Sequence, residues 1–513
     1  MASAFINNRK PFTAIIILLC AFMVVFQGCK KKRRWDMPGI LFKKTQNKVF
    51  NKLDVDAYYT VFTKVLDSIG PKLNNYQFIK IYYTLHKDEP GLVEKHLPDD
   101  GLKVMVDYFQ KAGTHGFNPG IFQADTIDAL LHDFYDKKAI KNTDEAYHDL
   151  AKLELLSANS LLNYSNYVQF GYVNPKKIFP RYFTATKEAD SASMLQVFRE
   201  SSLRTYLDSI QPKDPQYIAL QKALVNDDVV PGLSIEESKR VLLVSLERLR
   251  WKNKPQGDRY VIVNIPDFRL DVIDSGHSVL NMKVCVGQGR NMDYSKNLMH
   301  FDDTDRVDKP QAHETPLLSS VIYMAQVNPV WNIPQSIASK EIVKEEIDDK
   351  FYLSNKGIDV YKNGKKIDDP EDIDWTTADV SDYDFKQEPG DDNSLGKIKF
   401  IFKNKSNVYL HDTPAKSAFF EAMRAVSHGC VRLQQPLELA HNLFGDGEKY
   451  DTITKDMTDN NPDPTDLNLP KKVPVYITYV TCWADSTGTL QYRRDVYGQD
   501  IVLFSNLEKV LPN

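Results

Sequence analysis

"RYVIVNIPDFRLDVID", residues 259–274, is the stretch where the chain changes from a helical to a β periodicity. Late in this run Phe268 and Leu270 alternate with polar residues, which is the period-2 pattern of a strand with one buried face. The turn signal Ser275–Gly276 then separates it from "VLNMKVCVG", residues 279–287, which alternates in the same way. The two runs together predict a β-hairpin.

Further β-patterned runs follow toward the C-terminus. They are "GKIKFIFKN" (396–404), "NVYLHD" (407–412), "VPVYITYVTCWAD" (473–485) and, after a Gly488 turn, "TGTLQYRRDV" (487–496). Their β-branched and aromatic content favours strands. We therefore expect a mostly-β domain over residues 258–484, followed by a C-terminal strand and tail over 485–513.

The first half of the chain has a helical period from about Asp54 to Ala223. "AYHDLAKLELLSANSLL", residues 146–162, places its leucines near one helical stripe. Ser234, with Glu237 three residues on, is a capping-box signal for a later helix. We expect an all-α scaffold domain over residues 54–247, so that the whole chain is an α+β multidomain protein.

Residues 334–396 lie between expected strands of the β domain. The segment contains 17 Asp or Glu against 8 Lys or Arg, and it follows the apolar, aromatic run "NPVWNIP". A long segment inside a compact domain is usually functional or disordered. We expect a partly folded lid rather than a flexible tail.

The N-terminus has the composition of an export signal. Arg9 and Lys10 precede an uncharged stretch, Phe12–Phe26, and "FQGC" ends at Cys29 before a basic cluster. The end of this segment, 1–29, resembles the cleavage site of a bacterial lipoprotein, which predicts lipidation at Cys29; a retained signal anchor is the alternative. Residues 30–53 would be a linker. Either reading places the protein in the cell envelope, membrane-anchored on the periplasmic side.

Three cysteines remain for the folded body. Cys285 and Cys482 lie in expected strands, where packed structural thiols are the ordinary interpretation. Three is an odd number, so at least one thiol is unpaired within a monomer. Cys430 is the candidate for chemistry.

Cys430 belongs to "YLHDTPAKSAFFEAMRAVSHGCVRL", residues 409–433. It precedes an expected helix at Pro436, whose N-terminal field would lower the pKa of the thiol. His411 and His428 are candidates to take its proton, and Gly429 lets the backbone approach a substrate carbonyl closely. A buried thiol beside a structural histidine is the alternative interpretation.

This stretch resembles the signature of the L,D-transpeptidase (YkuD) family, a histidine followed after a spacer by S/T-H-G-C. Here 15 residues separate His411 from "SHGCVR". Other stretches, among them "TPLLSSVIYMAQVNPVWNIPQSIA", are similar to the large YcbB-type members with a helical scaffold, from about Asp54 to Ala484. Two features depart from that group. No clear peptidoglycan-binding module lies within residues 213–247, and Arg432 stands where many smaller members have asparagine.

The resemblance implies a mostly-β catalytic domain of the YkuD type, with the insertion 334–396 as its lid, and it assigns roles to single residues. Cys430 would be the nucleophile and His411 the general base and later the acid. The supporting residues would be Asp412, which fixes the His411 ring, Ser427, His428, Gly429 and Arg432, which shape the oxyanion and substrate site, and Tyr409 and Trp331, which line the cleft.

The implied reaction is acyl transfer through a Cys thioester, forming 3→3 cross-links between peptidoglycan stem peptides. The partners would be a tetrapeptide donor and an amine acceptor, carbapenems would act as inhibitors, and neither a metal nor an organic cofactor is implied. With water as acceptor the enzyme would be an L,D-carboxypeptidase. An inactive wall-binding protein is the other alternative, whereas a papain-type peptidase would need a different sequence around its cysteine.

Composition excludes several other classes. The net charge of −4 gives no global basic field, so no nucleic-acid partner is expected. The sequence contains no P-loop, Rossmann fingerprint or paired zinc-ligand pattern.

Overall fold

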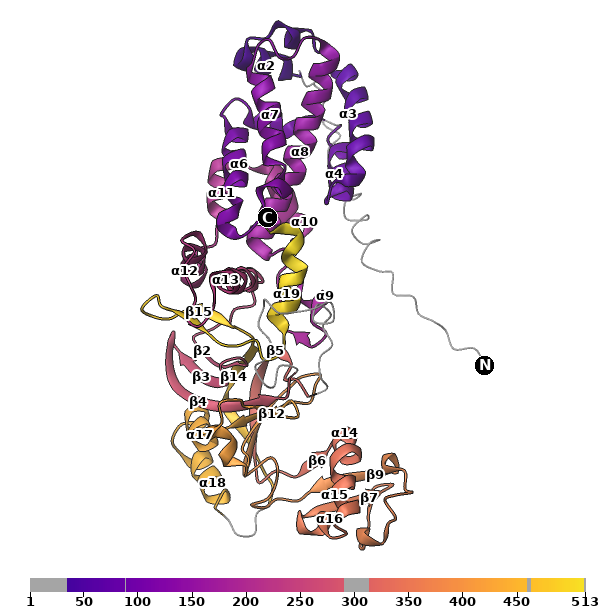
Figure 1. Ribbon diagram of the computed structural model, residues 1–513, viewed down its shortest axis with the longest axis vertical. Helices are drawn as coiled ribbons and strands as arrows, with labels where there is room; N and C mark the ends of the chain where they lie inside the picture. Colours follow the sequence, from indigo (N-terminus) through magenta and orange to yellow (C-terminus); the bar gives the residue numbers. More distant parts are fainter. Residues whose placement is uncertain (1–34, 88, 290–312, 459–462, 512–513) are drawn as a thin grey trace, which may run out of the picture. The chain divides into compact units, whose positions relative to one another are not determined.

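The computed structural model describes residues 35–87, 89–289, 313–458 and 463–511. The expected export signal with Cys29 lies outside the described residues. The chain divides into two compact units, which are Met1–Asp100 with Ala129–Leu155, and Gly101–Asp128 with Leu156–Asn513. A helical region is followed by a strand-rich domain (Figure 1), so the predicted α+β class is confirmed.

The helical region begins at Met37 and ends at Arg250. Its last helix starts with the expected capping box, because Ser234 Oγ accepts from the Glu237 N–H while the Glu237 carboxylate accepts from the Ser234 N–H. The helices are α2 (Met37–Thr45), α3 (Val55–Ile69), α4 (Tyr76–Leu85), α5 (Gly91–His96), α6 (Gly101–Gln110), α7 (Ala124–Tyr135), α8 (Thr143–Phe170), α9 (Pro175–Ile178), α10 (Ser191–Arg199), α11 (Leu203–Ile210), α12 (Pro215–Val225) and α13 (Ile235–Arg250).

The described part of residues 30–53 is not a linker, which corrects the expectation. It forms α2 and a 3₁₀ turn, Lys48–Lys52, and the side chains of Met37, Leu41 and Phe50 are fully buried. Met37 and Leu41 are four residues apart and so share one face of α2. Burial of this apolar face gives the segment a fixed place in its unit.

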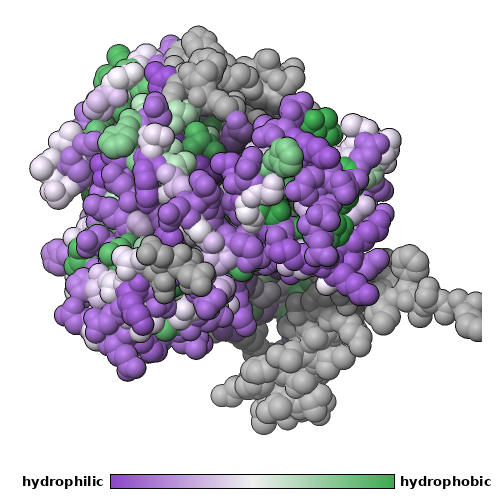
Figure 2. All heavy atoms as spheres, turned by 90° about the horizontal axis from the view of Figure 1, so that it is seen from below, coloured by the Kyte–Doolittle hydropathy of each residue, from purple (hydrophilic) through white to green (hydrophobic). Residues whose placement is uncertain are grey.

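The face of the molecule drawn in Figure 2 is mostly hydrophilic where its residues are described, with apolar side chains in small areas. Among the described residues, no helix has both the length and the apolar character needed to cross a bilayer.

The strand-rich domain is built on one sheet that closes on itself. Its strands run in the order β5-β10-β11-β13-β4-β3-β2-β14, and β14 pairs again with β5. Two strands are added to this ring, because β1 pairs with β5 and β12 with β4. The strands are β1 (Tyr182–Phe183), β2 (Arg259–Asn264), β3 (Arg269–Asp274), β4 (His277–Gly287), β5 (Leu317–Val327), β10 (Ile398–Phe402), β11 (Leu410–His411), β12 (Ala425–Ser427), β13 (Val431–Leu433) and β14 (Thr465–Thr478).

The hairpin expected from the sequence is β3–β4. Ser275 and Gly276 have φ of 51° and 82°, and two central residues of positive φ match the right-handed twist of the flanking strands. The expected hairpin about Gly488 is present as β15 (Cys482–Ala484) and β16 (Leu490–Tyr492). Cys285 and Cys482 are buried, free thiols.

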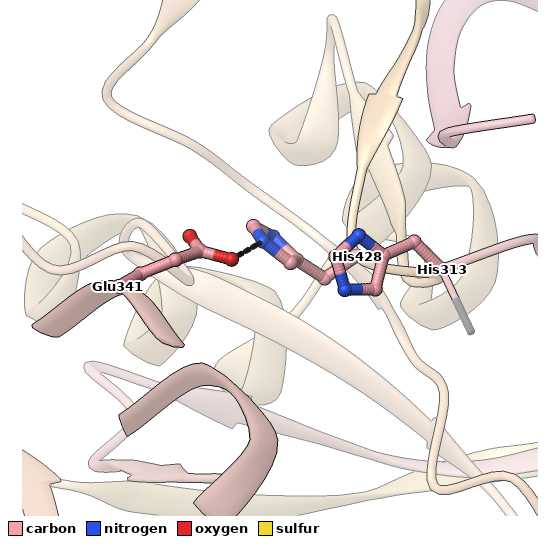
Figure 3. A group of neighbouring side chains, drawn as sticks. All are labelled: His313, Glu341 and His428. Carbon is pink, nitrogen blue, oxygen red and sulfur yellow. Dashed lines mark hydrogen bonds and ion pairs between the residues drawn. The ribbon is translucent and has the colours of Figure 1, made fainter. Parts of the chain in front are cut away.

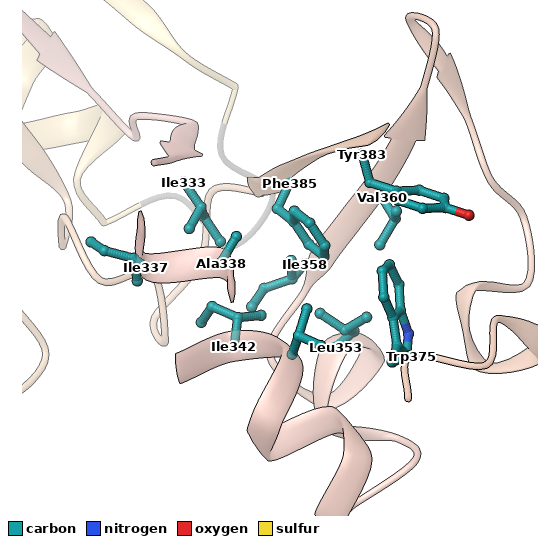
Figure 4. Packing of buried hydrophobic residues seen from close by; sticks show 11 residues of the cluster. Ile333, Ile337, Ala338, Ile342, Leu353, Ile358, Val360, Trp375, Tyr383 and Phe385 are labelled. Carbon is teal, nitrogen blue, oxygen red and sulfur yellow. The ribbon is translucent and has the colours of Figure 1, made fainter. Parts of the chain in front are cut away.

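The insertion is a folded subdomain with a sheet of its own, ordered β6-β9-β7-β8. Figure 4 shows its core, in which Ile342, Leu353 and Trp375 pack beneath the sheet residues Val360 and Phe385. The elements are β6 (Trp331–Ile333), α14 (Gln335–Ile337), a π-helical turn η5 (Ala338–Ile342), α15 (Val343–Asp348), α16 (Tyr352–Asn355), β7 (Ile358–Lys362), β8 (Lys365–Lys366) and β9 (Tyr383–Gln387). Its acidic side chains therefore surround an apolar core.

The C-terminus is not a tail, contrary to expectation. After β16 the chain forms α19 (Gln499–Leu507), in which Ile501, Leu503 and Leu507 are buried. Arg248 of α13 forms a buried ion pair with Asp500. This apolar helix, which also carries a residue of a buried ion pair, makes the segment part of the domain core.

Two further helices, α17 (Pro436–Phe444) and α18 (Glu448–Asp456), precede β14.

Candidate active site

Cys430 lies on a tight turn between β12 and β13, which we call the Cys430 turn (residues 427–430). Ser427 Oγ donates to the Cys430 carbonyl at 2.6 Å and accepts from the Gly429 N–H at 3.2 Å. Gly429 has φ of 117°, a region that favours glycine over residues with a Cβ. Within the described residues the Cys430 N–H makes no hydrogen bond, so it is a backbone donor that an oxyanion can use.

Strand register places the candidate residues on one face of the sheet. β11 pairs in parallel with β13, with Leu410 opposite Val431 and His411 opposite Arg432. Lys399 of β10 lies opposite His411. Paired residues share a face, and so do residues two apart on one strand. Cys430 and Arg432 therefore face the same side as His411 and Lys399.

His411 is held as a neutral base. Its Nδ1 lies 2.5 Å from the Asp412 carbonyl and donates to it, so Nε2 is the unprotonated nitrogen of the neutral ring. Burial lowers the pKa of His411 to about 4, and the charge of Arg432 contributes to this lowering. The backbone carbonyls of Asp412 and Leu395 act in the opposite direction, to raise the pKa. The ring is therefore uncharged at neutral pH and available to accept a proton.

Asp412 orients this ring, as the resemblance implied, but through its backbone carbonyl and not through its carboxylate. The carboxylate accepts from the Lys397 N–H at 2.9 Å and pairs with Lys416. A Cβ at Gly396 would come within 2.5 Å of it, so only glycine fits beside this carboxylate. The backbone carbonyl of Asp412 performs the orienting role instead.

The Cys430 thiol is not acidified, contrary to the expectation from a helix N-terminus. β13 separates Cys430 from α17, which begins only at Pro436. Burial raises the pKa of Cys430 to about 11, although the Tyr409 N–H, Arg432 and Lys399 act in the opposite direction. The Cys430 thiol is therefore neutral at rest, as is the His411 imidazole on the same face of the sheet.

Two cationic side chains flank the thiol. Burial lowers the pKa of both Arg432 and Lys399, while a thiolate at Cys430 would act to raise each. The Arg432 Nε is buried and makes no hydrogen bond among the residues that the structure describes. The Lys399 ammonium lies 5.4 Å from the centre of the Tyr409 ring. A carboxylate of a bound ligand is the natural partner for such donors.

Two other residues that were predicted for the site, His428 and Trp331, interact with the insertion and not with Cys430. His428 directs its Nε2 to Glu341 of the insertion at 2.7 Å. Trp331 begins β6 and packs against the core of the insertion, which gives it a structural role there. In the part of the chain that the structure describes, neither residue makes a hydrogen bond or a ring contact with Cys430, whereas the Tyr409 N–H donates to the Cys430 sulfur.

Sequence reasoning missed the residues that brace the Cys430 turn. Thr315 Oγ1 donates to the Gly429 carbonyl at 2.8 Å and accepts from the Gly287 N–H at 2.7 Å. The Tyr497 hydroxyl accepts from the Thr315 N–H and donates to the Gly287 carbonyl. Three of these four contacts join residues more than a hundred positions apart, and the fourth, between Gly287 and Thr315, joins residues 28 apart, so no local spacing in the sequence predicts them.

Thr315→Val should therefore destabilise the protein, because it leaves the Gly287 N–H and the Gly429 carbonyl without their buried partner. Each such group costs about 1–3 kcal/mol of unfolding free energy. Urea denaturation measures the change. Thr478→Val is the matched control, since that hydroxyl makes one bond, to the Val263 carbonyl. Equal losses in the two variants would contradict the bracing role of Thr315.

Comparisons with known proteins agree with this geometry. Residues 258–462 match the model of the L,D-transpeptidase catalytic domain, YkuD, and residues 77–224 match that of a scaffold domain. A Haemophilus influenzae protein named "Putative L,D-transpeptidase" is 27% identical over 266 residues, 52% of this chain and 49% of that protein. The chain thus spans about half the length of this curated relative.

Solved structures give a weaker likeness. An L,D-transpeptidase from Mycobacterium smegmatis and L,D-transpeptidase 3 from Mycobacterium tuberculosis are each 12% identical, over 43% of this chain and 58% and 61% of theirs. Their TM-scores are 0.20 and 0.18, and similarities this small do not bear on the site.

Proposed function

Since the chain carries a YkuD-family L,D-transpeptidase catalytic domain and a scaffold domain, as its sequence predicted, we propose that it cross-links peptidoglycan by 3→3 acyl transfer through Cys430. The observation that carries this proposal is the pairing of β11 with β13. It sets a neutral His411, with its Nδ1 proton fixed, on the same face of the sheet as the Cys430 thiol.

In the proposed acylation, His411 Nε2 takes the thiol proton as Cys430 Sγ attacks the carbonyl carbon of the third residue of a tetrapeptide stem. The Cys430 N–H stabilises the oxyanion. The bond to D-alanine then breaks, the leaving amine receives the proton from His411, and a thioester remains. Arg432 and Lys399 would bind carboxylates of the donor.

In the second step, the side-chain amine of another stem attacks the thioester. Its proton passes to His411 and then to the departing Cys430 sulfur, which restores the thiol. The new amide joins the third residues of two stems.

The N-terminal segment with Cys29 would hold the protein on the periplasmic side of the membrane, and fractionation of a Cys29→Ser variant tests that placement.

Muropeptide analysis tests the reaction. The purified protein is incubated with disaccharide-tetrapeptides, and the products are separated and weighed by mass spectrometry. Dimers joined 3→3 support the proposal. Tripeptides without dimers would mean an L,D-carboxypeptidase, and an unchanged substrate would mean a wall-binding protein.

A carbapenem is expected to acylate Cys430 at a rate that hardly depends on pH near neutrality. The pKa of His411 is lowered to about 4 and that of Cys430 is raised to about 11, so the reactive neutral pair dominates between these values. The rate should change by less than about threefold between pH 6 and 9. Intact mass spectrometry over time measures it. A rate that climbs tenfold per pH unit would instead indicate attack by a thiolate formed without His411.

The insertion is proposed as a lid that keeps water from the thioester. Its ends are close, because Asn393 Nδ2 donates to the Pro329 carbonyl at 3.0 Å. A short Gly-Ser linker can therefore replace residues 330–392 while keeping Leu395 beside His411 and Gly396 beside Asp412. We expect a several-fold rise in the ratio of tripeptide to 3→3 dimer. An unchanged ratio, in a variant that still forms the carbapenem adduct, would show that the insertion is not a lid.

A further inference from the structure

Three potential metal ligands converge beside the Cys430 turn. They are His428 of the turn itself, Glu341 of η5 in the insertion, and His313, which lies shortly before β5 (Figure 3). One ligand atom from each lies within 4.8 Å of the other two. The His313 and His428 rings are 4.5 Å apart between centroids, and His428 Nε2 is 2.7 Å from the Glu341 carboxylate.

The ligand set is that of a transition-metal site. Two imidazoles and one carboxylate are a common set for Zn²⁺, with a fourth position left for water. Metal–ligand bonds of 2.0–2.2 Å in a tetrahedron require ligand atoms about 3.3 Å apart. The separation of His428 Nε2 from the Glu341 carboxylate, 2.7 Å, is shorter than this, and all three ligand atoms lie within 4.8 Å of one another, so side-chain rotations of an ångström or so would complete the geometry.

The backbone around the cluster is built to present these side chains. Glu341 lies on a π-helical turn between two α-helical segments, and π turns of this kind occur frequently at functional sites. The His313 carbonyl lies against Gly287 and Gly429, where an added Cβ would come within 1.8 Å and 3.5 Å of it. His313 is thereby held against the Cys430 turn.

The side chains also remain reachable from solvent. The exposed fractions are 33% for His428 and 44% for Glu341, so an ion can enter. Lys340 and Arg181 are the nearby cations that act on His313, and the ion must bind against their charge. Two imidazoles and one carboxylate are a sufficient set for Zn²⁺ even so.

We propose that His313, Glu341 and His428 bind one Zn²⁺ ion, which ties the insertion to the turn that carries Cys430. Glu341 and His428 come from parts of the chain 87 residues apart, so the ion bridges two separately folded elements. The bridge restrains the insertion two residues from the nucleophile. It supplies no step of the chemistry and acts by limiting how the insertion moves.

The test measures zinc binding to the full chain in a Cys430→Ala background, so that the reactive thiol contributes nothing. Equilibrium dialysis should give one tightly bound Zn²⁺ per chain. Glu341→Gln and His313→Gln should each weaken binding by more than the roughly 10–100-fold that loss of an outer-sphere partner costs. Asp446→Asn is the matched control, because Asp446 pairs with His441 at 2.8 Å without a third ligand among the described residues.

Hydrogen exchange supplies the second measurement. Zn²⁺ should slow exchange several-fold in residues 338–342 and 427–430 of the Cys430→Ala protein, and it should not do so when Glu341→Gln is added. Absence of bound zinc overturns the proposal. So does affinity that survives both ligand substitutions, or that falls as much in Asp446→Asn, since either result places the ion elsewhere. These outcomes are independent of whether the protein makes 3→3 dimers.

Discussion

Cys430→Ala is expected to reduce formation of 3→3 dimers by on the order of 10⁶-fold, to the uncatalysed background. The substitution removes the thiol that forms the thioester in the proposed reaction. It should leave the fold intact, because Ser427 holds the Cys430 turn through the Cys430 carbonyl and the Gly429 N–H, which alanine retains. Muropeptide analysis and far-UV circular dichroism measure the two properties.

Cys482→Ala is the control for this variant. Cys482 is a buried thiol of β15, on a small sheet separate from the one that carries Cys430. Its loss should leave cross-linking unchanged. Dimers that persist in Cys430→Ala, or that disappear in Cys482→Ala, would remove Cys430 from the role of nucleophile.

His411→Ala should slow acylation of Cys430 by roughly 10²–10⁴-fold, the usual contribution of a general base. The thiol then has no neutral imidazole to take its proton, and its raised pKa leaves little thiolate at pH 7. The rate of carbapenem adduct formation measures the loss. If the loss is small, the base is His428, and His428→Ala should then show the large effect.

Asp412→Asn separates two ways of orienting His411. The ring nitrogen donates to the Asp412 backbone carbonyl, which asparagine keeps, whereas the carboxylate contacts the Lys397 N–H and Lys416. Acylation should therefore fall far less in Asp412→Asn than in His411→Ala. A comparable loss would mean that the Asp412 carboxylate, and not the Asp412 backbone carbonyl, orients the His411 ring.

Local patterns in the sequence were reliable where the structure depends on neighbours. The β3–β4 hairpin follows from alternation around Ser275–Gly276, and the start of α13 from Ser234 and Glu237. The secondary structure of apolar segments without a clear period is harder to predict from the sequence. α19 is apolar on most of its surface because it is buried on most sides, so its residues show no amphipathic period that would predict a helix.

The site was only partly predictable for a related reason. Residue types and spacing indicate Cys430 and His411 as the candidate catalytic pair. The direction in which the pKa of the Cys430 thiol shifts depends instead on how deeply the turn is buried. The role of Asp412 depends on which of its oxygens faces the ring. Trp331 required knowledge that β6 belongs to the sheet of the insertion. Each of these facts is set by tertiary packing, which spacing does not encode.

The closed sheet has a consequence for how the protein is made. β14 pairs with both β2 and β5. The Asn264 side chain accepts a hydrogen bond from the N–H of Val480, which lies 216 residues later in the chain. Contacts this distant form slowly, because the loop must close before they stabilise anything. Tyr497, which braces Thr315, is translated later still. The brace that holds the Cys430 turn is therefore complete only after synthesis has proceeded well past Cys430 itself.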